Sequence, residues 1–398
     1  MKAPALVLPT LVSFAERNGY KMKRALSLLL VATMLLMLCA CGGGVSSNAT
    51  APAENSSNSL MPDNGDEAPN FSGREIVFGV WGGSFADACL QAYVEPFEKL
   101  TGATVTIEEY GPDVTAKVIA QKEQGVKGFD VISGCGVTDQ MANMAKRGAL
   151  LKLDYSKMPN SDYVEAKYDY CVGQYILSIL IAWNTDVYGE DPPDTMAKYF
   201  DTENYPGNRA DCAFGNNGRL EQILLANGES IDSIYPVDTE QAYKLLDECQ
   251  YRENVAVWWD SASTIRQILA DGEVDCGIFW GGSVLEAIMS DGLDNIALSH
   301  DYAALVTDGM AITATCRDPE LAYAFVDYCL SAEAEAKWSE LKYYAPTNPQ
   351  AYNYIDPEML PYFTTYGENG KTAFYCDVDY LIENNERDTE QWLLYIGG

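Results

Sequence analysis

The sequence predicts an α/β protein with two lobes, each a sheet covered by helices, that are joined by two long strands. Three observations lead to this prediction. From residue 75 onward, short runs of strand-forming residues alternate with stretches in which apolar residues recur at helical spacing. Two extended runs, residues 175–183 and 302–313, stand out from the shorter ones. The tetrapeptide Trp-Gly-Gly-Ser occurs at residues 81–84 and 280–283, and each copy ends a strand pattern and begins a helical one.

The first section of the chain has a βαβαβα pattern. Strands are expected at residues 76–81, 103–108 and 129–133, and helices at residues 86–100, 113–123 and 137–147. The short connections between them favour a parallel sheet with helices on both faces. Ligands bind at the carboxyl ends of the strands in such sheets, and Trp81 and the turn at residues 133–136 would lie there.

The second section repeats the α/β pattern. Helices are expected at residues 220–227, 239–249, 263–271 and 319–331, and strands at residues 255–258 and 276–280. The extended run at 175–183 leads from the first section into the second, and the run at 302–313 follows the second. Two lobes that share two long strands would give this order.

The N-terminal segment has the pattern of a secretory signal. Basic residues within 21–24 precede an apolar run at 25–38, which is too short for a comfortable membrane span. The tetrad Leu-Cys-Ala-Cys that ends at Cys41 resembles a bacterial lipobox. That resemblance implies cleavage after residue 40 and attachment of diacylglycerol to Cys41, so that residues 1–40 are a signal peptide. An ordinary signal peptide is the alternative, and Met22 would make a tidier start than Met1.

The stretch after Cys41 is expected to be a tether. Residues 42–73 are rich in Gly, Ser, Asn, Ala and Pro and contain almost no large apolar side chain. Such a composition cannot bury enough apolar surface to form a core, so we expect a disordered segment.

The composition excludes several classes of function. The formal net charge is -32, with 58 acidic against 26 basic residues, and a phosphate backbone would be repelled. Nucleic acid is therefore excluded as a partner, while a cationic ligand is permitted. The only histidine is His300, which we expect at the surface, so a histidine-based triad, a His-rich metal site and a resident metal are not expected. Nine cysteines follow Cys41 without a CxxC pair, which favours buried thiols.

Seven stretches occur in an order and spacing that resemble a known family. They are the strand that ends at Trp81, PFEKLTGATVTIEEYG, GFDVISG followed by DQMANMAKRGALLKLD, ILIAWNTDVYGEDPPDT, GEVDCGIFWGGS, VTDGMAI and KYYAPTNP. Together they resemble the extracellular solute-binding proteins of ABC transporters, in the group that contains the spermidine/putrescine-binding proteins. The resemblance implies a periplasmic-binding-protein-like fold with the ligand clamped at a two-strand hinge. Lobe one would comprise residues 74–178 and about 306–348, and lobe two residues 179–305 and about 349–398.

The resemblance also implies ligand contacts. Trp81 matches a tryptophan of lobe one that packs on the alkyl chain of the ligand, and Phe85 falls near a tyrosine that contacts the ligand. Trp280 matches a tryptophan contributed by lobe two. Asp308 matches an aspartate that takes a terminal ammonium group.

Other positions of the resemblance are less complete. Ser261 and Ser263 lie where a serine lines the cleft. The loop at residues 214–218, which includes Asn217, replaces the Asp and Glu that hold the second amine in the polyamine binders. The turn around Cys135 replaces a tyrosine. Half of the amine-recognition set is therefore absent.

Each Trp-Gly-Gly-Ser copy is interpreted as a strand end, a glycine turn and a serine that caps a helix. Glycines such as Gly82 would let the backbone approach a bound molecule. Lobe closure would bring Trp81 and Trp280 towards one ligand, and a cation over each ring would gain roughly 0.5–2 kcal/mol. The alternative is that both tryptophans are core residues of two unrelated joints.

We therefore expect a solute receptor without a catalytic step or cofactor. The ligand would bind an open form, the lobes would close, and the closed form would dock on an ABC permease. The expected ligand is a polyamine such as putrescine or spermidine, while an amino-acid-like, sugar or metal-chelate ligand stays open. Tyr343 and Tyr344 would suit a ferric site but are expected to pack. A surface glycosidase that uses only carboxylates, or a structural adhesin, are alternatives from other classes.

The receptor is expected to act as a monomer on the outer face of the cell membrane. Lipid on Cys41 would hold it there, and the space would be periplasmic in a cell with an outer membrane.

Overall fold

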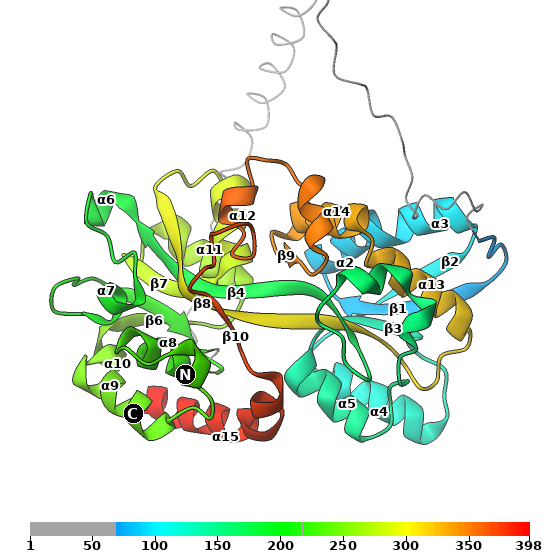
Figure 1. The fold of residues 1–398 in the computed structure, drawn as a ribbon, viewed down its shortest axis with the longest axis horizontal. Coiled ribbons are helices and arrows are strands. Elements are labelled where there is room, and N and C mark those ends of the chain that lie inside the picture. The colour runs from blue at the N-terminus through cyan, green and yellow to red at the C-terminus, as the bar shows by residue number, and fades with distance from the viewer. Residues whose placement is uncertain (1–68, 216–217) are drawn as a thin grey trace, which may run out of the picture. The chain divides into compact units, whose positions relative to one another are not determined.

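The computed structural model describes residues 69–215 and 218–398 (Figure 1). Cys41, Asn217 and residues 1–68 lie outside the described residues, so the predictions on them stay untested. The tether was expected to extend to residue 73, but the last residues of that stretch belong to the folded body, because Phe71 is buried in the core. The Phe71 amide donates to the Thr101 carbonyl at 2.8 Å, and the Arg74 guanidinium lies 4.7 Å from the centre of the Phe71 ring. The folded body therefore begins several residues before residue 74.

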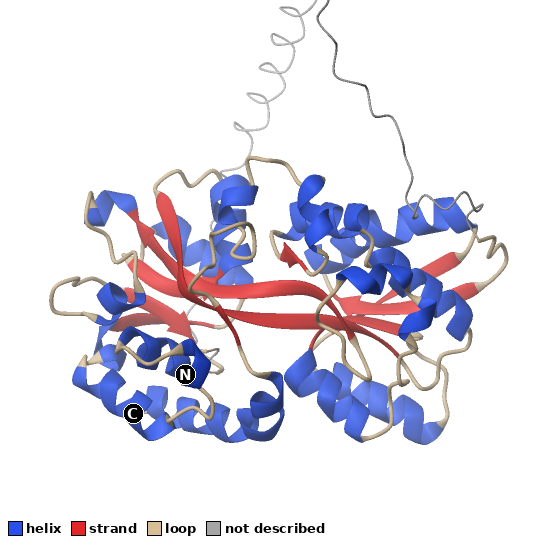
Figure 2. Ribbon diagram, viewed as in Figure 1, coloured by secondary structure: helices blue, strands red, loops and turns tan. Residues whose placement is uncertain are grey.

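The strands form one mixed sheet, and the predicted α/β class is confirmed. Its main path has the order β2-β1-β3-β8-β4-β7-β5-β6, while β9 pairs with β4 and β10 pairs with β8. Figure 2 shows helices on both faces of this sheet. The helices cover two groups of strands, which we call half one and half two.

Half one contains the predicted parallel strands. They are β1 (Glu75–Trp81), β2 (Thr104–Tyr110) and β3 (Val131–Gly136). Strand β1 lies between β2 and β3 and is parallel to both, with Phe78 opposite Ile107 and Val131. Alternation along β1 buries Ile76, Phe78 and Val80 against one layer of helices, as a period of two requires.

Two layers of helices cover half one. The first layer is α2 (Ser84–Cys89), the π-helical η1 (Leu90–Val94), α3 (Glu95–Thr101), α13 (Pro319–Cys329) and α14 (Ala332–Lys342). The second layer is α4 (Val114–Gln124), the π-helical η2 (Val137–Met141) and α5 (Ala142–Lys146). The single helix expected at 86–100 is thus a continuous run of three helical segments. It ends at Gly102, whose φ of 71° suits a left-handed cap.

Half two repeats the parallel arrangement. Its strands are β5 (Arg209–Cys212), β6 (Val255–Trp259) and β7 (Cys276–Trp280), and β5 is parallel to both neighbours. Its main helices are α7 (Met196–Phe200), α8 (Arg219–Ala226), α9 (Thr239–Glu248), α10 (Tyr251–Asn254), α11 (Ala262–Asp271), α12 (Gly281–Met289) and α15 (Val378–Gly397). Helices α8, α9 and α15 bury one face of the strands, and α11 and α12 bury the other.

Two long strands belong to both halves, as predicted. Strand β4 (Val172–Asn184) and strand β8 (Ile296–Ile312) are antiparallel to each other and run through the middle of the sheet (Figure 1). Both are longer than the sequence pattern suggested. Strand β8 pairs with β3 at one end, and β4 pairs with β7 at the other. The two strands therefore form the whole central part of the sheet between the halves.

Short elements complete the chain. They are η3 (Tyr155–Lys157), η4 (Pro159–Tyr163), α6 (Thr185–Tyr188), η5 (Ile231–Ser233), β9 (Ala345–Pro346), η6 (Pro349–Asn353), η7 (Leu360–Tyr362) and β10 (Phe374–Tyr375). Among the residues that the structure describes, no helix combines the length and apolar character that crossing a membrane requires.

Candidate ligand-binding site

The strand ends of the two halves point towards the same stretch of β4. The end of β3 at Gly136 lies opposite Asp308 of β8, and Asp308 lies opposite Tyr175 of β4. The end of β7 at Trp280 lies opposite Ile179 of β4 and approaches from the other direction. Tyr175 and Ile179 are four residues apart, so about 13 Å of strand separates the two edges. This register places the predicted ligand residues of both halves around one short region.

Trp81, at the carboxyl end of β1, is held in place by contacts with Gly134 and Tyr110. Its indole Nε1 donates to the Gly134 carbonyl at 2.6 Å, and its ring meets Tyr110 edge-on with centroids 5.2 Å apart. Gly134 has a φ of 77°, and a Cβ there would lie 2.5 Å from the Phe85 ring and 3.1 Å from Trp81. Glycine is therefore required at 134, and its absence of a side chain brings Trp81 and Phe85 together. Both rings keep part of their surface exposed.

Asp308 has a single hydrogen-bond donor among the described side chains. The Tyr175 hydroxyl donates to Asp308 Oδ2 at 2.6 Å, and no described residue donates to Oδ1. Burial raises the pKa of the Asp308 carboxyl to about 6, and the nearby Asp139 adds to that rise. An ionised carboxylate without a cation is costly where water is partly excluded. Asp308 is thus suited to accept a positive charge.

Asp139, at the start of η2, supplies a second carboxylate to this region. A Cβ on Gly136 would lie 2.5 Å from Asp139 Oδ1 and 3.8 Å from Asp308 Oδ1, so the two acids flank the same glycine. Asp139 is exposed at the surface, and the protein atoms around its carboxyl group raise its pKa above the ordinary value. Neither acid forms an ion pair with a described residue. Asp139 was not predicted from the sequence, because its proximity to Asp308 depends on the β3–β8 register.

Tyr344 connects this carboxyl pair to half two. Its ring stacks on Tyr175, with centroids 4.9 Å apart and planes at 14°. A Cβ on Gly282 would lie 2.5 Å from Tyr344 Cε1, so the second Trp-Gly-Gly-Ser copy touches the other side of the ring. The expected packing role of Tyr344 is therefore observed, and the ring also links α12 to the hydroxyl group that binds Asp308.

Trp280 belongs to an aromatic cluster at the edge of half two. Its ring lies 5.0 Å from Trp259 and 5.8 Å from Phe214, and these three side chains follow or end β7, β6 and β5. Trp259 is fully buried and donates its indole N–H to the Ile278 carbonyl at 3.0 Å, which fixes the base of the cluster. Phe214 is 43% exposed, a large fraction for an apolar ring. The cluster therefore presents an aromatic surface at this edge, and Phe214 was not among the predicted site residues.

A buried ion pair holds the loop that carries Phe214. The guanidinium of Arg219, at the start of α8, binds the carboxylate of Asp211 at the end of β5, and both side chains are fully buried. The Tyr251 hydroxyl donates to the same carboxylate at 2.7 Å. The Gln222 amide bonds to the Ile179 and Tyr302 carbonyls, at 3.1 Å each, and so ties α8 to both central strands.

The remaining predicted site residues have other surroundings. Ser261 caps α11, because its hydroxyl accepts from the Thr264 amide at 3.2 Å, and it also lies 3.0 Å from the exposed Ser263 hydroxyl. Cys135 is fully buried with its sulfur 3.2 Å from the Tyr110 hydroxyl, and burial raises the pKa of its thiol to about 12. The Cys135 thiol is thus part of the core of half one. Gly82 is exposed, and a Cβ there would meet only the end of the Glu109 side chain.

The prediction that each Trp-Gly-Gly-Ser serine caps a helix is wrong. Helix α2 has Gly83 as its N-cap and α12 has Trp280, and neither has a side-chain cap. Ser84 is the first residue of α2 and accepts a hydrogen bond from Lys342 Nζ at 3.1 Å. Ser283 lies inside α12, one turn too late to cap it, with a buried hydroxyl that has no partner among the described residues.

His300 is partly buried, whereas the sequence suggested a surface position. Its ring nitrogens lie 2.9 Å from the Thr364 hydroxyl and 3.2 Å from the Pro361 carbonyl, and burial lowers its pKa. Within the described ranges, no group of three or more His, Cys, Asp or Glu side chains could hold a metal ion.

Comparison with known proteins identifies the family of the chain. Residues 92–365 match the model of a family described as bacterial extracellular solute-binding protein. The chain is 26% identical over 306 residues to spermidine/putrescine-binding periplasmic protein 1 of Haemophilus influenzae, which covers 74% of this chain and 80% of that protein.

Two solved structures share the fold. An ABC transporter substrate-binding protein from Bradyrhizobium japonicum has a TM-score of 0.73 at 24% identity, covering 81% of this chain and 99% of that one. A second solved structure, described as that of a GABA receptor, has a TM-score of 0.72 at 26% identity, covering 81% of this chain and 98% of that one. The fold is thus the two-lobed one of periplasmic binding proteins, with β4 and β8 as the connection. The chain belongs to the bacterial extracellular solute-binding proteins, the substrate-binding components of ABC transporters.

Proposed function

We propose that this protein captures a small amine-bearing solute for an ABC importer, with the ammonium group held by Asp308 and Asp139. The observation that carries the proposal is this pair of carboxyl groups. They flank Gly136, both have a raised pKa, and neither has a cationic partner among the described residues. A ligand cation would supply the missing charge.

The aromatic residues at both edges would hold the rest of the ligand. A cation or alkyl chain over Trp81 or Trp280 would gain roughly 0.5–2 kcal/mol per ring. A charge-assisted hydrogen bond to Asp308 would add on the order of 1.5–3 kcal/mol. These interactions act together only if the halves approach each other, so ligand binding favours a closed form. Putrescine and spermidine combine ammonium groups with alkyl segments and fit this arrangement.

The proposed route of the solute follows from the family. The closed form delivers the solute to a membrane permease, and lipid on Cys41 keeps the receptor at the outer face of the membrane. Residues 74–178 with 306–348, and 179–305 with 349–398, remain the proposed lobes.

A second candidate ligand is an amino acid whose amine and carboxylate are well separated. Lys342 Nζ donates to Ser84 Oγ beside the first Trp-Gly-Gly-Ser turn and has no ion pair among the described residues. Lys342 is half-buried, and burial lowers the pKa of its ammonium group. A ligand carboxylate there, with its amine at Asp308, would satisfy both charges. The similar GABA receptor makes 4-aminobutyrate the natural test compound.

Isothermal titration calorimetry on the purified protein would test the proposal. The compounds are putrescine, spermidine, 4-aminobutyrate and 1,4-butanediol, a neutral molecule of putrescine's length. We expect at least one amine to bind and the diol to give no heat. Asp308→Asn should weaken amine binding by about tenfold or more, whereas Asp260→Asn, at the exposed end of β6, should leave it unchanged. Binding of the diol, or an Asp308→Asn variant with unchanged affinity, would contradict the proposal.

A further inference from the structure

A cavity of about 410 Å³ lies on the other face of the two central strands. It is lined by Ile176 of β4 and Thr307 of β8, which pair with each other. Along their strands they alternate with Tyr175 and Asp308, so they point to the opposite face of the sheet, while Val306, which has the same alternation as Asp308, also borders the cavity. None of the predicted ligand residues lines this cavity. It is therefore separate from the site proposed for the amine.

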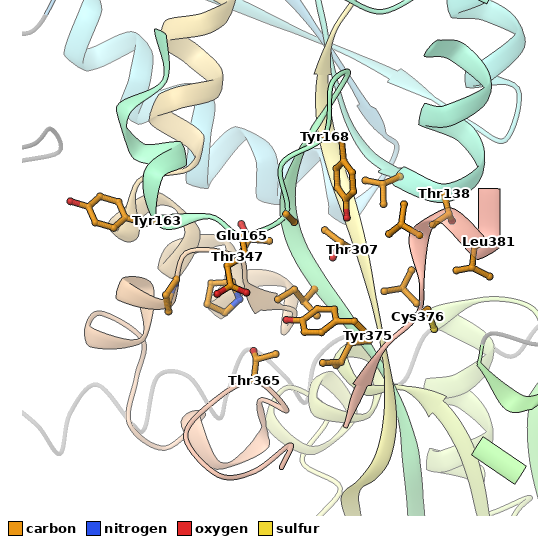
Figure 3. A pocket seen from close by; sticks show the side chains of 18 of the residues that line it. Thr138, Tyr163, Glu165, Tyr168, Thr307, Thr347, Thr365, Tyr375, Cys376 and Leu381 are labelled. Atoms are coloured by element: carbon orange, nitrogen blue, oxygen red, sulfur yellow. The ribbon is translucent and has the colours of Figure 1, made fainter. Parts of the chain in front are cut away.

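The walls of the cavity come from elements far apart in the sequence. Figure 3 shows side chains that converge on it from η2, from the loop after η4, from β8 and from the segment that includes β10 and the start of α15. Representative residues are Thr138, Tyr168, Thr307, Tyr375 and Leu381. The volume is in the range that small-molecule sites have.

The lining favours a neutral, mainly apolar occupant. It combines aliphatic side chains with four threonines and four tyrosines, and no Lys, Arg or His is among the lining residues. An anion would therefore find no counter-charge. The single carboxylate, Glu165, is exposed to water, so it provides only a weak attraction for a cation.

Thr307 offers the cavity a hydroxyl group that makes no hydrogen bond within the part of the chain that the structure describes. Its residue is 5% exposed, and its methyl group faces Gly173, where a Cβ would lie 2.9 Å from it. Its hydroxyl makes no hydrogen bond to a described residue, and the same holds for Thr138. The hydroxyls of Thr347 and Thr365 are engaged, with the Gly173 carbonyl at 3.2 Å and with the Tyr352 hydroxyl at 2.5 Å. The Thr307 hydroxyl is thus accessible from the cavity and can form a hydrogen bond with a bound molecule.

We propose that this cavity is a second binding site, for a neutral and mainly apolar molecule of about 10–20 non-hydrogen atoms that carries a hydroxyl or carbonyl group. The molecule would hydrogen-bond to Thr307 and pack against the aromatic and aliphatic walls. Because these walls come from both halves and from both central strands, occupation would also change the free energy of lobe closure.

The probe for this site is tryptophol, an indole with a neutral ethanol side chain. Its control is indole-3-acetate, which has the same size and a negative charge. Titration calorimetry on the purified protein should show one tryptophol site and at least tenfold weaker binding of indole-3-acetate. Thr307→Val, which keeps the shape of the side chain, should weaken tryptophol about fivefold. Thr106→Val, on the exposed face of β2, should have no effect.

A second variant and a competition experiment complete the test. Leu381→Trp adds bulk at the wall contributed by α15 and should abolish tryptophol binding. Asp308→Asn should leave tryptophol binding intact. The proposal would be overturned if tryptophol did not bind, if both cavity variants bound it normally, or if putrescine displaced it in direct competition. If neither the native protein nor any of these variants bound an amine, only the amine proposal would be overturned, and the proposal for the cavity would be unaffected.

Discussion

The two Trp-Gly-Gly-Ser turns have identical residues and different surroundings. In the first, Gly82 and Gly83 are exposed between β1 and α2, Gly83 has a φ of 71°, and Ser84 reaches Lys342. In the second, Gly281 and Gly282 are buried and already helical, so that α12 begins directly after Trp280. The glycines of the first turn are therefore accessible to a ligand, whereas those of the second turn pack against the rest of the protein.

The same tetrapeptide therefore serves two purposes in this fold. Both copies place a tryptophan at the carboxyl end of an inner strand, Trp81 at the end of β1 and Trp280 at the end of β7. Beyond the tryptophan, the glycines of the first copy leave space, while Gly282 of the second admits the Tyr344 ring. Tyr344 in turn stacks on Tyr175, which donates to Asp308. The second turn thus supports the carboxyl pair of half one through an aromatic contact.

The largest expected loss of stability comes from removing the buried ion pair that lies near the second turn. Asp211→Ala would leave the fully buried Arg219 without its carboxylate next to the cluster that contains Trp280. Loss of one partner of a buried pair costs about 3–5 kcal/mol, and urea unfolding would measure it. The control is Asp113→Ala at the exposed start of α4 in half one, for which we expect less than about 0.5 kcal/mol. Equal changes in the free energy of unfolding for both variants would show that the buried ion pair does not stabilise half two.

Substitution of the matching glycine in each turn tests directly whether only the second turn is packed. Gly282→Ala would force the Tyr344 ring away from α12, and overpacking of this kind costs about 1–3 kcal/mol. Gly82→Ala meets only the end of the Glu109 side chain and should change the free energy of unfolding by less than about 0.5 kcal/mol. Thermal unfolding of both variants would give the two values. If Gly82→Ala were the more harmful one, the assignment of the second turn to packing would be wrong.

The pH dependence of binding tests the carboxyl pair beside the first turn. With its pKa raised to about 6, Asp308 is largely ionised at pH 7 and largely protonated at pH 5. Putrescine keeps its charge in this range, so its affinity should fall about tenfold between pH 7 and pH 5. The same raised pKa lowers the stability of the unliganded fold above pH 6 and not below pH 3.8, so stability and affinity should change in opposite directions. A pH profile that stays unchanged in Asp308→Asn would contradict this account.

The smallest expected effects come from the two serines. Ser283→Ala removes a buried hydroxyl without a partner among the described residues, so the variant should be as stable as the native protein or more stable by about 0.5–1 kcal/mol. Ser84→Ala removes an exposed contact with Lys342 and should be neutral within about 0.5 kcal/mol. Denaturant midpoints of both variants would show the difference. Destabilisation by Ser283→Ala would mean that its hydroxyl has a function.

Much of the fold follows from periodicity in the sequence. The strands that end at Trp81 and Trp280 were predicted with errors of at most one residue, because each is a short apolar run that ends at glycines. Strand β5 was missed because Arg209 and Asp211 suggest a surface segment, whereas both are buried. The Arg209 guanidinium donates to backbone carbonyls, and Asp211 binds Arg219. Helix α15 was missed because it buries only Asp388 and Trp392, which gives no clear apolar stripe.

The candidate site was only partly predictable. Trp81, Trp280 and Asp308 followed from the family resemblance, and their role in binding a ligand stays a prediction. Asp139 could not be selected, since only the antiparallel register of β3 and β8 brings it near Asp308. The serine caps were mistaken because the sequence does not show that α12 begins at Gly281.

The central claim is that both Trp-Gly-Gly-Ser tryptophans serve one amine site. The most direct measurement is a tryptophan-fluorescence titration with putrescine and spermidine on the native protein, Trp81→Phe and Trp280→Phe. The account predicts a saturable response in the native protein and weaker binding in both variants, by about threefold to thirtyfold for each ring. A loss of affinity in only one variant, with the other unchanged, would contradict the proposal, because only one of the two tryptophans would then contribute to amine binding.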